Sequence, residues 1–155
     1  MSQSDLINPL LKARDVMESA VDVCAPEARL TDVLRELSRA KSGMLPVVEG
    51  GKPVGVLTER RVVAALAESP NAADWTVARA MSKTFPKIGP EARLNALFHY
   101  FGPHGVLVVA DDGQLLGVIH WLNLLGNVSE RGLGQILTAA VRGEDAERSA
   151  TAGRA

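Results

Sequence analysis

The sequence predicts an α+β fold that consists of two copies of a β-α-β-β-α unit, with further helices at the flanks. The string Pro-Glu-Ala-Arg-Leu occurs at 26–30 and again at 90–94, and each copy is followed by a glycine-containing turn between two short apolar runs. The chain has 155 residues, of which 46% are hydrophobic. Each unit is too small to bury a sufficient core alone, so we expect the two to share one.

Each copy of the string opens an amphipathic helix. At the spacing that separates the two strings, Met17 also matches Met81. The apolar residues that follow recur at i, i+3, i+4 and i+7, which is the pattern of one helix face. They are Leu30, Val33, Leu34 and Leu37 in the first copy, and Leu94, Leu97, Phe98 and Phe101 in the second.

A β-hairpin is predicted after each of these helices. In the first copy the apolar runs 45–49 and 53–57 flank a Gly-Gly turn, and in the second copy 106–110 and 115–119 flank an Asp-Asp-Gly turn. Both turns tolerate the positive φ angles that tight hairpins need. The second copy reaches its hairpin two residues earlier, so its loop between helix and strand is shorter.

The remaining elements complete each unit. Extended runs at 20–25 and 86–89 are predicted as the first strands, and Thr58 is a suitable N-cap for a second helix at 59–68. The matching helix of the second copy is predicted at 121–125.

Apolar residues at helical spacing from Leu133 to Val141 predict one more amphipathic helix, which must cover another surface. The predicted organisation is an N-terminal segment at 1–12, a first repeat at 13–68, a linker at 69–76, a second repeat at 77–127, the C-terminal helix at 128–143 and a mobile tail at 144–155.

Composition excludes several classes of protein. The formal net charge is −1, so no general electrostatic attraction to nucleic acid or to an anionic membrane is expected. The N-terminus does not resemble a secretory signal, and no apolar stretch is long enough to span a bilayer. Cys24 is the single cysteine, which suits a reducing compartment. We therefore expect a cytoplasmic protein.

The order of elements, together with Leu45-Pro46-Val47-Val48 and the segment from Gly55 to Arg60, resembles the CBS domain. Two copies in tandem resemble a CBS pair, or Bateman module. The resemblance implies a pseudo-two-fold pair of repeats packed sheet to sheet, with two clefts between them and assembly into a homodimer. No catalytic domain accompanies the pair in this sequence, so the resemblance implies a stand-alone sensor or adaptor.

In nucleotide-binding members of this family the second helix begins with Thr or Ser and carries Asp three residues later. The helix N-terminus suits phosphate, and the carboxylate accepts hydrogen bonds from ribose hydroxyls. The first copy keeps Thr58, but Arg61 occupies the Asp position and cannot accept from ribose. Arg60 and Arg61 can hold a phosphate or another anion, which favours a polyphosphate over a nucleoside. Equally, both can be solvated or paired with acidic neighbours.

The second copy departs further from the family pattern, because His120 replaces the Thr and Asn123 replaces the Asp. The amide oxygen of Asn123 can accept from a sugar hydroxyl, which makes this cleft the better candidate for a sugar. Alternatively, Asn123 bonds the local backbone. Phe85 lies where family members often contact the adenine, and Pro46 of the quoted motif is the remaining candidate for a ligand contact.

Catalytic and metal chemistry are not expected. The sequence has no Gly-x-Ser-x-Gly elbow, P-loop or dinucleotide fingerprint. His99, His104, His120 and Cys24 are metal-ligating residue types, but nothing in their spacing indicates that they converge.

The leading hypothesis is a non-enzymatic sensor that binds a small anionic ligand between its repeats and relays this to a protein partner. An adenine nucleotide such as AMP, ADP or ATP is the expected ligand. The alternative is a structural dimerisation or interaction adaptor whose clefts have lost nucleotide binding, with the C-terminal helix docking a partner or a second subunit.

Overall fold

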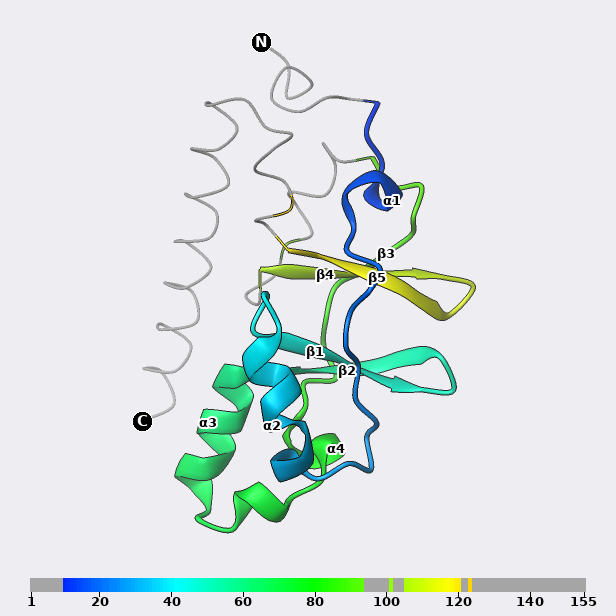
Figure 1. Cartoon of the computed structure of the whole chain (residues 1–155). Helices are drawn as coiled ribbons and strands as arrows, with labels where there is room; N and C mark the ends of the chain where they lie inside the picture. The colour runs from blue at the N-terminus through cyan, green and yellow to red at the C-terminus, as the bar shows by residue number, and fades with distance from the viewer. Residues whose placement is uncertain (1–9, 94–100, 102–104, 121–122, 124–155) are drawn as a thin grey trace.

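The computed structural model describes residues 10–93, 101, 105–120 and 123, and the account below is confined to them. The first amphipathic helix, both hairpins and the helix that begins after Thr58 form where the sequence predicted them, whereas the short helices at 13–16 and 77–80 were not predicted. The two hairpins lie side by side (Figure 1). The elements in chain order are α1 (Ala13–Val16), α2 (Leu30–Arg39), β1 (Met44–Glu49), β2 (Lys52–Thr58), α3 (Glu59–Glu68), the short 3-10 helix η2 (Ala72–Asp74), α4 (Val77–Ala80), β3 (Lys87–Ile88), β4 (Val106–Asp111) and β5 (Gln114–His120).

The two predicted hairpins are confirmed, and equivalent residues are paired within each of them. β1 and β2 pair antiparallel from Met44 opposite Thr58, and β4 and β5 pair from Val106 opposite His120. Each hairpin has a register shift near its turn, after Val47 and after Val109 respectively. The turns adopt positive φ angles that Gly and Asp accept with little strain.

The first strand is shorter than predicted in both copies. In the second copy, β3 pairs parallel to β4 over two residues. In the first copy, the strand predicted at 20–25 is reduced to a single parallel bridge between Cys24 and Val47. Ala25-Pro26 ends the pairing, because proline has no N–H to donate to a ladder. Residues before Cys24 instead run across the other sheet.

Each repeat places its N-terminal helix on the sheet of the other repeat. Val77 at the start of α4 donates to the carbonyl oxygen of Ala28 over 2.7 Å, and α4 packs into the core formed by α2, α3 and the first hairpin. Ala13 at the start of α1 donates to the carbonyl oxygen of Ala92 over 2.8 Å and packs under β4 and β5. The repeats in the sequence are therefore interlocked rather than separate packing units.

The interlocking requires the chain to cross each hairpin closely. Glu18 and Val118 exchange two backbone hydrogen bonds of 2.9 and 3.0 Å, and Val56 and Ser82 form the equivalent pair with 2.9 and 2.8 Å. A glycine precedes the hairpin residue in both pairs. A Cβ on Gly117 would lie 2.5 Å from the Glu18 carbonyl oxygen, so only glycine allows this approach.

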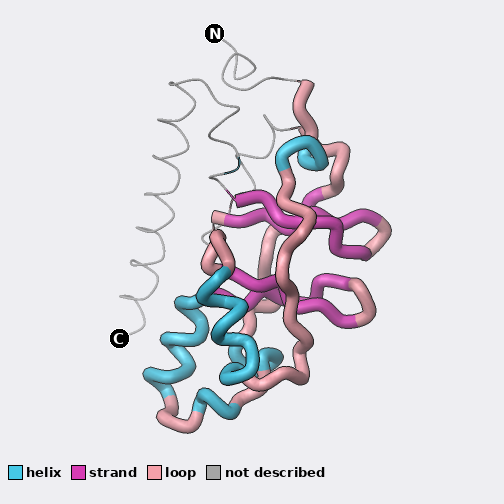
Figure 2. Tube along the Cα trace, in the orientation of Figure 1, coloured by secondary structure: helices cyan, strands magenta, loops and turns pink. Residues whose placement is uncertain are grey.

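A third apolar cluster joins the two sheets. Figure 2 shows the two magenta hairpins stacked with the crossing segment of 18–24 running past both. The cluster is built from Met44, Val56, Val106, Val108 and Val118, with Val21, Phe85 and Leu115 packed against it. The sheet-to-sheet arrangement implied by the family resemblance is thus the observed one.

Several predicted elements lie outside the described residues. They are the N-terminal segment up to residue 9, most of the amphipathic helix of the second repeat, the helix predicted at 121–125 apart from Asn123, the C-terminal helix and the tail. Among the helices that the structure does describe, none has the length and apolarity needed to cross a bilayer.

Candidate ligand cleft between the repeats

A cleft opens where the first repeat meets the second. It is lined by residues of segments 18–22 and 39–46 and by Val118 of β5, and we call it the Asp22 cleft. Its volume is about 120 Å³. Pockets for drug-sized ligands span roughly 300–1,000 Å³, so the cleft as it stands is smaller than a nucleotide needs.

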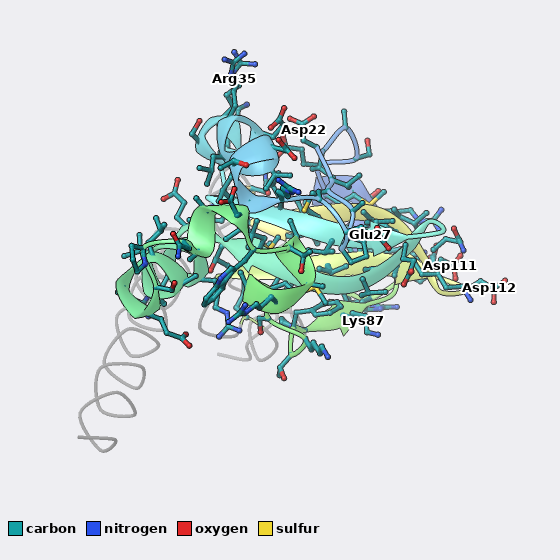
Figure 3. All side chains as sticks on the ribbon, turned by 90° about the horizontal axis from the view of Figure 1, so that it is seen from below. Asp22, Glu27, Arg35, Lys87, Asp111 and Asp112 are labelled. Carbon is teal, nitrogen blue, oxygen red and sulfur yellow. The ribbon has the colours of Figure 1, made fainter. Side chains whose placement is uncertain are left out.

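Backbone contacts hold the wall formed by residues 18–22 at both ends. Glu18 is fixed to Val118 by the paired hydrogen bonds of the crossing, and Cys24 donates its N–H to the carbonyl oxygen of Pro46 over 3.0 Å. Val21 between them packs into the cluster that joins the sheets. The segment is therefore held by backbone hydrogen bonds at both ends. Asp22 projects from it as an exposed side chain close to α2 (Figure 3).

The opposite wall comes from the end of α2 and the loop that follows. α2 ends at Arg39, and Gly43 with φ of 65° turns the chain into β1. This places Arg39 and Lys41 on the cleft with their side chains exposed. Within the described residues the ion pairs are those of Glu91 with Lys12 and Arg14, so the charged groups of the cleft are not paired with one another.

Thr58 serves as the N-cap of α3. Its side-chain oxygen accepts a hydrogen bond from the N–H of Arg61 over 3.1 Å, and only 8% of the residue is exposed. The hydroxyl thereby satisfies one of the free N–H groups at the helix start. Thr58 lies opposite Met44 in the hairpin, next to a residue that lines the cleft, but it does not itself line it.

Arg61 contacts the chain just before the second repeat. Its Nε donates to the carbonyl oxygen of Ala80 and its Nη2 to that of Met81, each over 2.9 Å. These carbonyls are at the end of α4, where a cation is favoured by the helix dipole. Arg61 thus ties the start of α3 to the entry of the second repeat, which is a role that the sequence did not indicate.

In the second repeat, His120 and Asn123 stand at the positions of Thr58 and Arg61. Here the later residue supplies the side-chain acceptor and the earlier residue supplies the backbone donor. Asn123 Oδ1 accepts from the N–H of His120 over 2.7 Å. A complete capping box contains both hydrogen bonds, from N3 to the N-cap side chain and from the N-cap N–H to the N3 side chain. The first repeat keeps one of these bonds and the second keeps the other. A hydrogen bond to the local backbone is the alternative that the sequence analysis gave for Asn123, and the structure contains it.

Of the seven predicted ligand residues, one is among those that line the Asp22 cleft. Pro46 lines the Asp22 cleft. Phe85 packs between the two sheets, and Lys87 Nζ lies 5.4 Å from its ring centroid. Arg60 is exposed in the first turn of α3. A role in ligand binding for Thr58, Arg60, Arg61, Phe85, His120 and Asn123 remains a prediction.

Sequence reasoning missed the four charged residues of the cleft, Glu18, Asp22, Arg39 and Lys41. A signal for them exists in the comparison of the two copies. Glu18 and Asp22 match Ser82 and Pro86, and the loop of the second copy has no charged residue between Phe101 and Gly105 apart from the titratable His104. A charged residue that occurs in only one copy is not required by the fold that both copies share, so such a position is a candidate for another role.

Two titratable groups near the cleft have shifted pKa values. Burial raises the pKa of the Cys24 thiol from 9.0 to about 11. Burial also lowers the pKa of His120 from 6.5, and the negative charge of Glu18 partly opposes this shift. Within the described ranges, no group of three or more His, Cys, Asp and Glu residues is arranged to hold a metal ion.

The family model of the CBS domain matches residues 13–68 and 77–130. The chain belongs to the CBS domain family. The two matched segments form a tandem CBS pair, an arrangement that implies a regulatory, ligand-sensing module.

Individual relatives agree with this assignment. The chain is 30% identical over 123 residues to the A-adding tRNA nucleotidyltransferase of Geobacter sulfurreducens, which covers 78% of this chain and 14% of that enzyme. The chain thus spans about a seventh of the length of the curated relative that it matches. The similarity does not extend over most of that enzyme, so it assigns no tRNA chemistry to this CBS pair.

Solved structures share the fold. A conserved CBS domain protein of unknown function from Thermoplasma acidophilum has a TM-score of 0.71 and 19% identity over 83% of this chain and 75% of its own. A Methanocaldococcus jannaschii protein, described as a proposed archaeal homologue of γ-AMPK, has a TM-score of 0.69 and 22% identity over 77% of this chain and 48% of its own.

Proposed function

We propose that this CBS pair is a sensor that binds an adenine nucleotide, or a related small anionic ligand, in the Asp22 cleft and relays occupancy to a protein partner. The observation that carries the proposal is the composition of the cleft wall. Residues of the first repeat line it together with Val118 of the second, and Glu18 is hydrogen-bonded to Val118 across the join. A ligand in this cleft would touch both repeats at the place where they interlock.

A displacement of segment 18–22 on ligand binding can be transmitted to both repeats. Segment 18–22 leads back to α1, which packs under the second sheet, and onward to α2, which packs on the first. A ligand that binds one placement of this segment more tightly than another shifts the balance between the two placements. The relay therefore requires only a small displacement of the extended segment that connects Met17, packed against one core, to Cys24 in the other.

The expected ligand class rests on the family and on the charges of the cleft. CBS domains generally bind adenosine-containing ligands, and the M. jannaschii neighbour is described as a proposed homologue of γ-AMPK. Arg39 and Lys41 supply positive charge for an anionic group at the mouth. The cleft volume of about 120 Å³ means that lining side chains must rearrange when a nucleotide binds.

The test is a thermal-shift and calorimetric titration of the full chain with AMP, ADP, ATP, NADH and S-adenosylmethionine. At a ligand concentration of a hundred times Kd, binding to the native state adds about 2.7 kcal/mol to the free energy of unfolding. We expect at least one member of the panel to raise Tm by several degrees. Unchanged melting curves with all five compounds at millimolar concentration would contradict the proposal.

A pair of matched variants locates the site. Ala20 lines the cleft and is exposed, so Ala20→Leu should fill part of the volume and weaken binding. Ala64 is an exposed alanine on α3 that does not line the cleft, and Ala64→Leu should bind as the parent does. Equal loss of binding in both variants would place the ligand elsewhere.

The adaptor function is a second candidate, favoured by one observation on α3. Val63 is 65% exposed and Leu66 is 44% exposed, one helical turn apart on the same face. Exposed apolar side chains at this spacing suit a second copy of the chain or another protein. Val63→Glu with Leu66→Glu should then lower the solution mass or abolish partner binding, while Arg35→Glu on the exposed side of α2 should not. A solution mass unchanged by the paired glutamates would count against homodimerisation through this face.

A further inference from the structure

α1 and α4 begin on equivalent backbone segments. Ala78 of α4 donates its N–H to the carbonyl oxygen of Pro26 over 2.9 Å, and Arg14 of α1 donates to that of Pro90 over 3.0 Å. Both members of one pair match those of the other at the spacing that separates the repeated strings. Since the backbones match, the side chains beside these bonds occupy equivalent positions, and a difference between them comes from residue type.

Where α1 begins, the carboxylate of Glu91 is engaged by two cations. Lys12 Nζ lies 2.6 Å from Glu91 Oε2, and the guanidinium of Arg14 contacts Glu91 Oε1. Both oxygens of this carboxylate therefore have a positively charged partner within the molecule.

Where α4 begins, the same acid is present without the cations. Glu27 matches Glu91 in the repeated string, but Thr76 and Ala78 occupy the positions of the lysine and the arginine, and neither carries a charge. The ion pairs of the described residues are those of Glu91, so Glu27 has no cation partner among them. A groove lies at this place, and Glu27, Thr76 and Ala78 are among the residues that line it.

This groove, which we call the Glu27 groove, has a volume of about 490 Å³. Small-molecule sites span roughly 300–1,000 Å³, so the groove is large enough for a small ligand. Its apolar lining comes from Pro26, Val54, Ala78 and Met81. Its charged groups are Glu27, Glu49 and Lys83, all of them exposed. Among the described residues neither glutamate lies within ion-pair distance of Lys83.

We propose that the Glu27 groove binds a free basic amino acid, such as arginine or lysine. Near neutral pH this ligand carries two positive groups and one carboxylate on an aliphatic chain. The groove offers the complementary set of two carboxylates, one ammonium group and apolar side chains. Charge-assisted hydrogen bonds between such groups are stronger than neutral ones.

The contact at the start of α1 indicates how the ligand is oriented. There the equivalent glutamate pairs with the ends of a lysine and an arginine side chain, so Glu27 pairs with the side-chain cation of the ligand. Glu49 and Lys83 then remain for the ammonium and the carboxylate of the ligand. The ligand in effect supplies the cation that the chain itself supplies at the other contact.

Calorimetric titration of the full chain at low ionic strength tests the ligand class, because salt screens ion pairs of exposed groups. The probes are L-arginine, L-lysine, L-citrulline and agmatine. We expect arginine and lysine to bind with one molecule per chain. Citrulline should bind at least about tenfold more weakly than arginine, because its side chain has nearly the same shape but no charge. Agmatine lacks the carboxylate and should also bind more weakly than arginine.

Two single substitutions test the assigned contacts. Glu27→Gln should weaken arginine by about tenfold or more, whereas Glu91→Gln, at the equivalent position, should bind arginine as the parent does. Lys83→Gln should weaken arginine and leave agmatine unchanged, because agmatine has no carboxylate to lose a partner. Equal effects of Glu27→Gln and Glu91→Gln on arginine would overturn the assignment of the site.

A third variant rebuilds the contact found at the start of α1. Ala78→Arg places a guanidinium at the position of Arg14, where it can pair with Glu27 and fill the groove. We expect this variant to lose arginine binding while its Tm stays at or above that of the parent. Ala64→Arg adds the same charge on the exposed side of α3, outside the groove, and should bind arginine as the parent does.

The groove shares no lining residue with the Asp22 cleft, so the result is independent of nucleotide binding there. Glu27 and Ala78 are exposed, and circular dichroism melts of their variants should show a retained fold. The absence of arginine and lysine binding to the parent at millimolar concentration would overturn the proposal. Citrulline that binds as tightly as arginine would overturn charge recognition by Glu27, and arginine binding retained in Ala78→Arg would place the ligand elsewhere.

Discussion

Arg61 Nε lies 2.9 Å from the carbonyl oxygen of Ala80 and donates a hydrogen bond to it, across the boundary between the two repeats. A second bond from Nη2 to Met81 uses the planar fork of the guanidinium. In nucleotide-binding members of the family this position usually carries an Asp, whereas here the Arg61 side chain joins the two repeats. The start of α3 is thereby joined to the crossing of Ser82 past Val56.

Replacing Arg61 by Ala should therefore reduce the stability of the unliganded protein. The two bonds are partly buried, and we expect a loss of about 1 kcal/mol in the free energy of unfolding. Urea denaturation measures it, with Arg35→Ala as the control for loss of a cation from an exposed helix position. A variant that keeps the parental stability but loses ligand affinity would instead indicate that Arg61 binds ligand.

Gly117 and Gly55 should not tolerate a side chain. A Cβ at Gly117 would lie 2.5 Å from the Glu18 carbonyl oxygen, and one at Gly55 would lie 2.9 Å from that of Ser82. Since both neighbours are backbone atoms fixed by hydrogen bonds, Ala at either position should cost about 2 kcal/mol or more. Thermal melts provide the measurement. Gly89→Ala, where no atom lies within 4 Å of the added Cβ, should change Tm little; comparable losses at all three glycines would refute the crowding argument.

The sequence predicted the parts of the fold whose signals are local. Apolar periodicity located α2, the Gly-Gly and Asp-Asp-Gly turns located both hairpins, and Thr58 located the start of α3. The family resemblance then supplied the stacking of the sheets. Two local signals were misleading. The extended run 20–25 forms only a bridge between Cys24 and Val47, and Leu34 of the repeated apolar face is exposed beside the buried Val33 and Leu37.

The interlocking could not be predicted in this way, because it depends on contacts between residues far apart in the chain. Backbone hydrogen bonds join Val77 to Ala28 and Glu18 to Val118. The periodicity of apolar residues along a short stretch of sequence gives no information about such distant pairs. The same limit applies to the site. Arg61 and Thr58 were singled out by their position in a motif, whereas Asp22 and Arg39 line one cleft only because an extended segment passes the end of α2.

Cys24 should react slowly with thiol reagents in the native protein. Burial raises the pKa of its thiol from 9.0 to about 11, and the thiolate is the reactive form. A shift of this size lowers the thiolate fraction at pH 8 by about 100-fold. The rate with Ellman's reagent at pH 8 should therefore rise at least 100-fold in urea. A native rate close to that of the unfolded chain would contradict the buried position.

His120 should make the protein less stable as the pH falls below 6.5. Burial lowers its folded-state pKa from 6.5, so the unfolded chain binds more protons between the folded-state pKa and 6.5. The contribution of His120 to stability is thus fully present above 6.5 and is lost progressively as the pH falls through this window. His120→Gln should flatten this part of the dependence of Tm on pH.

An NMR titration measures the same pKa directly, and His120→Gln identifies the signal among the three histidines of the chain. We expect a value below 6.5 in the parent and a lower value in Glu18→Gln, because the charge of Glu18 favours the imidazolium. Asp15→Gln removes a carboxylate from α1 and should leave the pKa of His120 unchanged. A parental pKa above 6.5 would mean that the attraction of Glu18 exceeds the cost of burial, and the stability would then fall as the pH rises.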